Sequence, residues 1–308
     1  MKKHQPIFTL ILFIACYISS YSQSPIPKKT ENVVYGMASG SALLMDVYVP
    51  ERANHKAIIY IPGSSWGFNY PDDYNQMALK SDYDLDSTYT RKWVNSLCSY
   101  GFTVFIINHR FTPRFHFRDI IADCRRAVRY VRYNAAQFKI DGAHIGAMGH
   151  SSGANLVGIL GLSDTTNLDY SAPIDTVSSK VQATVTMAAP YNLTDLNSKN
   201  DSSMANLYVY SLLSTYMGHL PEEVNNTYIL SGDYFDASPY ALISDKASPM
   251  LMYCSDNDPI IPLRQATNMF TKLKAFNTPA KLIIKEKEGH TPKPDMSEVN
   301  KWFEQYLK

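Results

Sequence analysis

The sequence predicts an α/β fold in which a mostly parallel central sheet is covered by helices on both faces and entered through an antiparallel hairpin. Short, continuous apolar segments of strand length alternate with longer segments whose apolar residues recur at helical spacing. Such alternation is typical of parallel sheets, because each crossover between parallel strands packs a helix on the sheet. The chain of 308 residues is long enough for one large domain, which we expect over residues 23–308.

The first strands form the hairpin. Segments 33–36 and 43–50 carry apolar and β-branched residues, and the turn-forming segment 37–41 separates them. Residues 56–62 come next as a strand buried on both faces. Further strands are expected at 102–108, 143–149, 181–190, 248–255 and 280–287. Helices are expected at 91–102, 119–138, 151–163, 263–276 and 296–308.

Two segments interrupt the alternation. Residues 64–90 show little periodicity, and connections of this length in compact domains are often functional lids. Their tyrosines and aspartates fit either a polar, aromatic mouth of a binding site or an ordinary solvated surface. Residues 191–245 are polar apart from a helix-like segment at 204–220. We expect both segments to be insertions, with the second forming a cap over the carboxyl edge of the sheet.

The N-terminus has the layout of a secretory signal. Lys2 and Lys3 precede an apolar run at 7–18, and Ser20-Tyr21-Ser22 fits cleavage before Gln23. The sequence therefore predicts a signal peptide over residues 1–22 and an exported, periplasmic or secreted protein. The alternative is a lipoprotein in which Cys16 becomes lipidated and anchors the chain to the membrane.

Composition limits the partners. Lysine and arginine number 29 against 28 aspartates and glutamates, so no charge surplus argues for nucleic acid or an anionic membrane. Without the signal, Cys98, Cys124 and Cys254 remain, and their odd number and irregular spacing exclude a disulfide framework and a CxxC metal pair. The chain has no HExxH, P-loop or GxGxxG motif. We expect neither a metal nor an organic cofactor.

Two stretches match Gly-x-Ser-x-Gly, around Ser65 and around Ser151. A nucleophilic serine of this pattern lies on a sharp turn between a strand and a helix, with small flanking residues. Ser151 meets these conditions, because apolar residues precede it, Gly149 and Gly153 flank it and a helical segment comes after it. The segment after Ser65 lacks a helical pattern. Ser151 is the candidate nucleophile.

The partners of Ser151 are predicted from chain order, which is Ser, then Asp or Glu, then His in enzymes with such a turn. His219 and His290 are the histidines after Ser151, and His290 lies in a glycine- and proline-rich loop after the last strand. His219 lies in the expected cap and fits a surface or helix-end residue. Asp256 and Asp258 come after a strand; we favour Asp258, with Asp256 as a turn residue bonding its own backbone.

These motifs, together with "AIIYIPGSSW", "GFTVFIINHRF" and "SPMLMYCSDNDPIIP", resemble the feruloyl-esterase-like and hormone-sensitive-lipase-like branch of the α/β-hydrolase fold. That group includes small-acyl esterases, acetyl-xylan esterases and arylformamidases. The resemblance implies that Ser151, Asp258 and His290 form a catalytic triad. It also implies that Asn108-His109-Arg110 corresponds to a structural Asn-Tyr-Arg motif with histidine in the middle place.

The chain departs from this family at its first Gly-x-Ser-x-Gly stretch. Relatives carry His-Gly-Gly-x-Trp there, whereas this chain carries Pro62-Gly63-Ser64-Ser65-Trp66. The resemblance implies an oxyanion hole made by the backbone N–H groups of Ser64, Ser65 and Ser152. A serine held at positive φ costs roughly 1 kcal/mol, and Pro62 lacks the side chain that helps to fix the loop in relatives.

The sequence thus predicts an exported serine hydrolase that cleaves carboxylic esters, such as small acyl, acetyl or feruloyl esters, including those on carbohydrates. The first alternative is an arylformamidase, amidase or peptidase with the same triad. The second is a non-catalytic binding protein whose oxyanion loop has decayed.

Overall fold

The computed structural model describes residues 27–67, 88–164, 172–196, 204–225 and 227–308. The predicted signal segment with Cys16 and most of the segment 64–90 lie outside these ranges. The same is true of part of the segment 191–245. The predicted division into one domain with two insertions stays a prediction.

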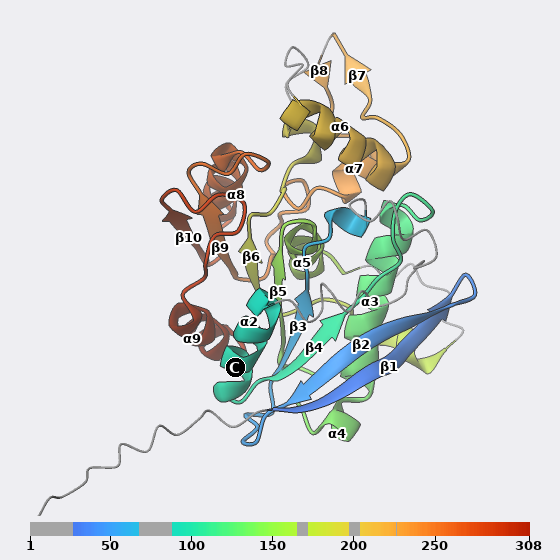
Figure 1. The fold of residues 1–308 in the computed structure, drawn as a ribbon, viewed down its shortest axis with the longest axis vertical. Helices are drawn as coiled ribbons and strands as arrows, with labels where there is room; N and C mark the ends of the chain where they lie inside the picture. The colour runs from blue at the N-terminus through green and yellow to red at the C-terminus, as the bar shows by residue number, and fades with distance from the viewer. Residues whose placement is uncertain (1–26, 68–87, 165–171, 197–203, 226) are drawn as a thin grey trace, which may run out of the picture.

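One sheet of eight strands forms the centre of the molecule, in the order β1-β2-β4-β3-β5-β6-β9-β10 (Figure 1). The pairs β1/β2 and β2/β4 are antiparallel, and every other neighbouring pair is parallel. The strands are β1 (Lys28–Ala38), β2 (Ser41–Val49), β3 (Ala57–Ile61), β4 (Thr103–Ile107), β5 (Ile145–His150), β6 (Ala183–Met187), β9 (Met250–Ser255) and β10 (Ala280–Lys285). The predicted mostly parallel sheet entered by a hairpin is confirmed.

Helices cover both faces of this sheet. Strand residues that alternate along β3 and β9 belong to different apolar clusters, because successive side chains of a strand point to opposite faces. The cluster of Ile58, Tyr60 and Leu251 packs against α2 (Thr88–Ser99) and α9 (Met296–Tyr306). The opposite face packs against α3 (Phe117–Tyr133), α5 (Ser152–Leu162) and α8 (Leu263–Ala275).

The predicted helix over 119–138 is wrong in one respect, because the chain breaks it at Asn134. Helix α3 ends at Tyr133, and a separate turn, α4 (Ala135–Phe138), comes after it. The side-chain amide of Asn134 donates to the carbonyl of Tyr130 at 2.8 Å. Asparagine side chains compete in this way for backbone groups and favour helix ends over helix interiors.

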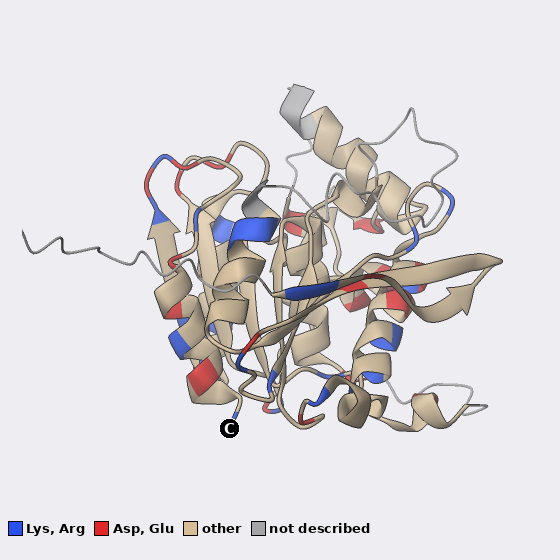
Figure 2. Ribbon diagram, turned by 60° about the horizontal axis from the view of Figure 1, so that its bottom comes forward, with Lys and Arg blue, Asp and Glu red and all other residues tan. Residues whose placement is uncertain are grey.

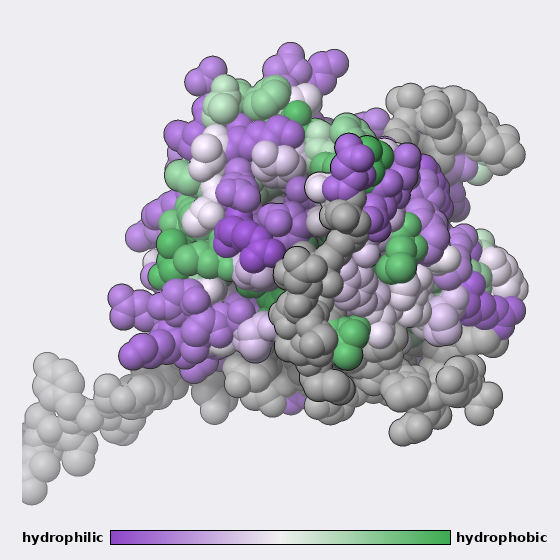
Figure 3. All heavy atoms as spheres, turned by 90° about the horizontal axis from the view of Figure 1, so that it is seen from above, coloured by the Kyte–Doolittle hydropathy of each residue, from purple (hydrophilic) through white to green (hydrophobic). Residues whose placement is uncertain are grey.

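Residues 204–225 and 227–245 lie above the carboxyl ends of the parallel strands (Figure 1). They form α6 (Met204–Met217), a small hairpin of β7 (Glu223–Val224) and β8 (Thr227–Tyr228), and α7 (Gly232–Asp236). The helix expected at 204–220 is confirmed, whereas the hairpin and α7 had no sequence signal. Seen from above, the surface is mainly hydrophilic, with hydrophobic side chains in separate groups (Figure 3).

Basic and acidic residues lie interspersed over the helices, strands and loops (Figure 2). This distribution agrees with the near balance of charges in the sequence. No helix within the described ranges has both the length and the apolar character needed to cross a membrane.

Candidate active site

Ser151 lies at a sharp turn between β5 and α5, which we call the second turn (residues 149–153). Its φ and ψ are 52° and −122°, a conformation that few residues other than glycine adopt. The turn needs a small residue at Gly153, where an added Cβ would lie 2.2 Å from the carbonyl oxygen of Ile61. The chain therefore holds a strained serine at the carboxyl edge of the sheet, directly before a helix N-terminus.

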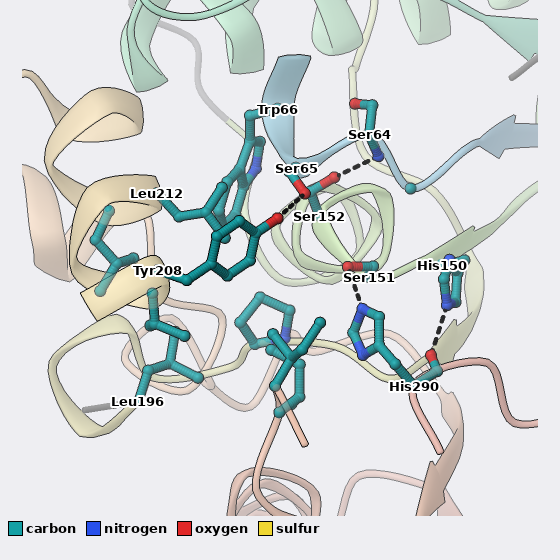
Figure 4. Close-up of a pocket in the computed structure, with 16 residues that line it drawn as sticks. Ser64, Ser65, Trp66, His150, Ser151, Ser152, Leu196, Tyr208, Leu212 and His290 are labelled. Carbon is teal, nitrogen blue, oxygen red and sulfur yellow. Dashed lines mark hydrogen bonds between the residues drawn. The ribbon is translucent and has the colours of Figure 1, made fainter. Parts of the chain in front are cut away.

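His290 and Asp258 complete a hydrogen-bonded series with Ser151. Figure 4 shows the bond between Ser151 and His290. His290 Nε2 lies 2.9 Å from Ser151 Oγ, and His290 Nδ1 lies 2.8 Å from Asp258 Oδ2. Because a carboxylate only accepts, Nδ1 of neutral His290 carries the proton and Nε2 accepts from the serine hydroxyl. The structure thus brings the three residues together in the predicted order.

The surroundings of Asp258 keep it ionised. Its side chain is 2% exposed, and burial alone would raise its pKa. The hydrogen bond from His290, the charge of His290 and the amides of Ile261 and Ile260 outweigh burial and hold the pKa below its ordinary value. A buried carboxylate that stays ionised can stabilise positive charge on the neighbouring imidazole.

Asp256 and His219, the two residues that we did not favour for the triad, make other contacts. Asp256 Oδ1 accepts the backbone N–H of Lys287 at 2.7 Å. Asp256 lies in a turn, as expected, but the expectation that its side chain bonds its own local backbone is wrong. Asp258 makes the local bonds instead, to Ile260 and Ile261. His219 lies after α6, is about half exposed and lies beside the carbonyl of Leu220, as expected of a helix-end residue.

The other Gly-x-Ser-x-Gly stretch, which we call the first turn (residues 63–67), comes after β3 and forms a short 3-10 helix over Ser65–Gly67. Ser65 and Trp66 have positive φ values of 51° and 55°. The strain expected of a non-glycine residue in this loop therefore falls on Ser65 and Trp66. The backbone N–H of Ser64 donates to the side-chain oxygen of Ser152 at 2.9 Å. One predicted oxyanion donor thus has an acceptor within the protein.

Helix α6 supports the first turn. The rings of Trp66 and Tyr216 stack with centroids 4.0 Å apart and planes 8° from parallel. The hydroxyls of Ser65 and Tyr208 lie 3.4 Å apart (Figure 4). Tyr216 is fully buried, so this contact fixes the strained loop against the segment that lies above the sheet.

A cavity of about 190 Å³ opens beside Ser151. The first and second turns form one wall, with His290 beside them. The opposite wall is apolar and comes from α6 and two loops: Pro190, Leu196, Val209, Leu212, Leu213, Ile260 and Ile261. This arrangement can hold a small apolar group next to the serine hydroxyl.

His150, the last residue of β5, contacts the loop that carries His290. Its Nε2 lies 2.8 Å from the carbonyl oxygen of His290. Burial, together with the charge of His290, lowers the pKa of His150 to about 4. His150 is therefore neutral near pH 7 and donates through Nε2.

The segment Asn108-His109-Arg110 is buried behind the site. Arg110 forms a double hydrogen bond with Asp123, both contacts being 2.9 Å long. Burial lowers the pKa of His109 to about 4, and its Nδ1 lies 2.7 Å from the carbonyl of Arg110. These contacts hold the loop after β4, whose Thr112 N–H donates to the carbonyl of Trp66 at 3.0 Å.

His150, Tyr208 and Tyr216 contribute to the site, and sequence reasoning missed them. The sequence could have indicated His150, because the residue directly before the serine of such a motif always lies beside the nucleophile. The two tyrosines lie about two turns of α6 apart in a segment with many tyrosines, so nothing in the sequence distinguished them.

In the described part of the chain, Cys98, Cys124 and Cys254 are free and buried, and no three acidic, histidine or cysteine residues are grouped as a metal ion requires.

The sheet order, the serine turn between strand and helix and the Asp-His-Ser series together define an α/β-hydrolase. Residues 45–273 match the family model described as BD-FAE. The chain therefore belongs to the BD-FAE family, which confirms the resemblance to the feruloyl-esterase-like branch.

Named relatives agree with this class. "Esterase LipQ" of Mycobacterium tuberculosis is 24% identical over 77% of this chain and 51% of LipQ. "Probable carboxylic ester hydrolase LipM" of the same organism is 26% identical over 59% of this chain and 39% of LipM. The chain spans about half the length, or less, of these two relatives.

A solved structure described as a truncated form of a carbohydrate esterase from gut microbiota has a TM-score of 0.69 with this chain at 22% identity. The likeness covers 93% of this chain and 98% of that one. It confirms the α/β-hydrolase fold.

Proposed function

We propose that this protein hydrolyses carboxylic esters through an acyl-enzyme formed on Ser151. The observation that carries the proposal is the continuous hydrogen-bonded series from Asp258 through His290 to the strained Ser151 at the cavity. The names of the M. tuberculosis relatives, an esterase and a probable carboxylic ester hydrolase, support an ester as the substrate.

The reaction has two stages, acylation and deacylation of the serine. Ser151 Oγ attacks the ester carbonyl while its proton passes to His290 Nε2, 2.9 Å away. Asp258 stabilises the imidazolium that results. The tetrahedral intermediate collapses, the alcohol leaves with the proton from Nε2, and the acyl group stays on Ser151. Water then attacks the acyl-enzyme and gives a proton to Nε2, and Nε2 passes this proton to Ser151 Oγ as the bond to the acyl group breaks and the acid leaves.

The oxyanion would lie between the two turns. The N–H of Ser152 belongs to the first turn of α5, where backbone N–H groups have no acceptor within the helix, and the helix dipole adds positive potential there. Ser65 of the first turn also lines the cavity, on the same wall as Ser152. Ser64 can serve as the third donor if the oxyanion displaces or shares its bond to Ser152 Oγ.

We propose a small, apolar acyl group, because the cavity is about 190 Å³ and its far wall is aliphatic. The carbohydrate esterase of similar fold supports a carbohydrate as the alcohol part of the substrate. Initial rates with p-nitrophenyl acetate, butyrate and octanoate, with a feruloyl ester and with an aryl formamide test this choice. Faster turnover of the formamide than of every ester would favour the amidase alternative.

The catalytic role is tested by covalent labelling of Ser151. A fluorophosphonate probe should attach to the peptide that contains Ser151, as identified by mass spectrometry, and should abolish ester turnover with the same time course. Labelling elsewhere, or no labelling of a folded protein, would contradict the proposal and favour the non-catalytic alternative.

We also propose that residues 1–22 direct export of the protein. The cationic start, the apolar run and the small residues before Gln23 support this. Expressed with its N-terminus in a bacterial host, the mature protein should begin at Gln23 and reach the periplasm or the medium. A mature chain that begins at a lipid-modified Cys16 would favour the anchored form instead.

A further inference from the structure

We propose that His150 is a positioning residue that holds the His290 loop so that His290 Nε2 reaches Ser151. The inference rests on the proposed function, since it concerns the base of that reaction. The direct observation is the hydrogen bond from His150 Nε2 to the backbone carbonyl of His290, 2.8 Å long. Figure 4 shows His150 on the far side of His290 from Tyr208 and Leu212, which line the apolar part of the cavity.

The His290 loop has two sets of anchors. Three consecutive amides, those of Lys287, Glu288 and Gly289, donate to side chains at the end of β9: Asp256, Ser255 and Asn257, at 2.7, 3.1 and 2.9 Å respectively. These bonds fix the loop up to Gly289. The peptide carbonyl of His290 comes after them, and its bond to His150 fixes the direction of the residue that carries the imidazole.

The position of His150 makes it a precise anchor. It is the last residue of β5 and pairs with Met187 of the neighbouring strand, and Ser151 comes directly after it. The nucleophile and the anchor of the base therefore share one rigid strand end. A shift of His150 would change the distance between Ser151 and His290, and a displacement of about 1 Å at a reacting pair can cost roughly 10²-fold in rate.

The other ring nitrogen of His150 faces the first turn. A Cβ added to Gly63 would lie only 2.6 Å from His150 Nδ1, so the ring packs directly on the glycine backbone. His150 thus fills the space between the loop of the base and the loop with the predicted oxyanion donors. The size of the His150 ring and its donor at Nε2 both affect the geometry of the transition state. His150 can have this effect without touching the substrate.

The experiment compares His150→Gln, His150→Asn and His150→Leu. A glutamine amide nitrogen can reach the place of His150 Nε2, whereas an asparagine amide cannot, and leucine has no donor. We expect the leucine and asparagine variants to lose about 10- to 100-fold in kcat with KM changed less than about threefold. The glutamine variant should stay within about fivefold of the parent kcat. Thermal melts of each variant identify loss of folding.

Equal kcat in the three variants and the parent would overturn the inference. If the leucine variant does not fold, the comparison of glutamine with asparagine decides, and equal losses in these two would also overturn it. Ser151→Ala in the same assay separates this result from the proposed function. Full turnover by Ser151→Ala would refute the serine mechanism, whereas an inactive Ser151→Ala beside a fully active His150→Leu would refute only the role of His150.

Discussion

The first and second turns share the spacing Gly-x-Ser-x-Gly, and both hold the central serine at positive φ, 51° for Ser65 and 52° for Ser151. They differ in the segment after the serine and in the groups that face its hydroxyl. A 3-10 helix and an aromatic stack lie next to Ser65, whereas α5 begins after Ser151 and His290 lies against its hydroxyl. A strained serine in a small-residue motif is therefore not enough to make a nucleophile; the helix and the base distinguish the two turns.

The strongest test of this comparison replaces each serine by alanine. Ser151→Ala should lower kcat for p-nitrophenyl acetate at least about 10⁴-fold, because the attacking oxygen is removed. Ser65→Ala should cost less than about tenfold, since it removes a hydroxyl and keeps the backbone N–H. Similar losses in both variants would mean that the two turns do not have different roles.

The next test concerns the acid that serves only the second turn. Asp258→Asn should lower kcat about 10³- to 10⁴-fold, because the amide cannot favour the Nδ1–H tautomer of His290 or stabilise its positive charge. Asp256→Asn is the matched control in the same loop, and we expect a change below about fivefold. A larger loss in the Asp256 variant than in the Asp258 variant would reverse our assignment.

A smaller effect is expected where α6 supports the first turn. Tyr216→Leu removes the stack with Trp66, worth about 0.5–1.5 kcal/mol, and should lower kcat about 3- to 10-fold as the loop loses its fixed geometry. Tyr216→Phe keeps the ring and serves as the control. Steady-state kinetics and a thermal melt distinguish the two variants; an unchanged kcat in Tyr216→Leu would show that the strained loop does not need α6.

The last test concerns stability and pH, because a histidine with a lowered pKa lies beside each turn, the half-buried His150 at the second and the buried His109 behind the first. Burial lowers the pKa of each to about 4. Between the ordinary value of about 6.5 and that value, the unfolded chain binds protons that the folded protein does not. The free energy of unfolding should therefore fall as the pH falls through this window, by about 3 kcal/mol for His109 alone.

Denaturant unfolding at pH 7 and pH 4.5 measures this loss. The variant His109→Gln cannot titrate and can still bond the carbonyl of Arg110, so its stability should fall less between the two pH values. An equal fall in parent and variant would show that His109 is not a source of the acid sensitivity.

Most of the fold was accessible to sequence reasoning because buried parallel strands and crossover helices leave different periodicities. The assignment of Ser151, His290 and Asp258 used chain order and the ends of strands, and the structure brings these residues together. Contacts between separate segments left no such pattern. The bond from Ser64 to Ser152, the stack of Trp66 on Tyr216 and the partner of Asp256 each depend on how two distant loops meet.

The remaining errors have one local and one long-range cause. The helix expected through residue 138 ends early at Asn134, whose backbone leaves helical geometry and whose side chain adds a bond to the carbonyl of Tyr130. Asp256 lies in a turn, as an aspartate after a strand often does, yet its side chain accepts from the amide of Lys287, 31 residues away, and not from its own local backbone.

The three free thiols within the described ranges can report on unfolding. Cys98 lies in α2, Cys124 in α3 and Cys254 in β9, so one thiol lies in each layer of the molecule. Burial raises the pKa of Cys98 to about 12 and of Cys254 to about 11, and raises that of Cys124 well above its usual range. None can react with an alkylating reagent while its layer stays closed. The order in which the three cysteines become alkylated in mild denaturant therefore reports which layer of the protein opens first.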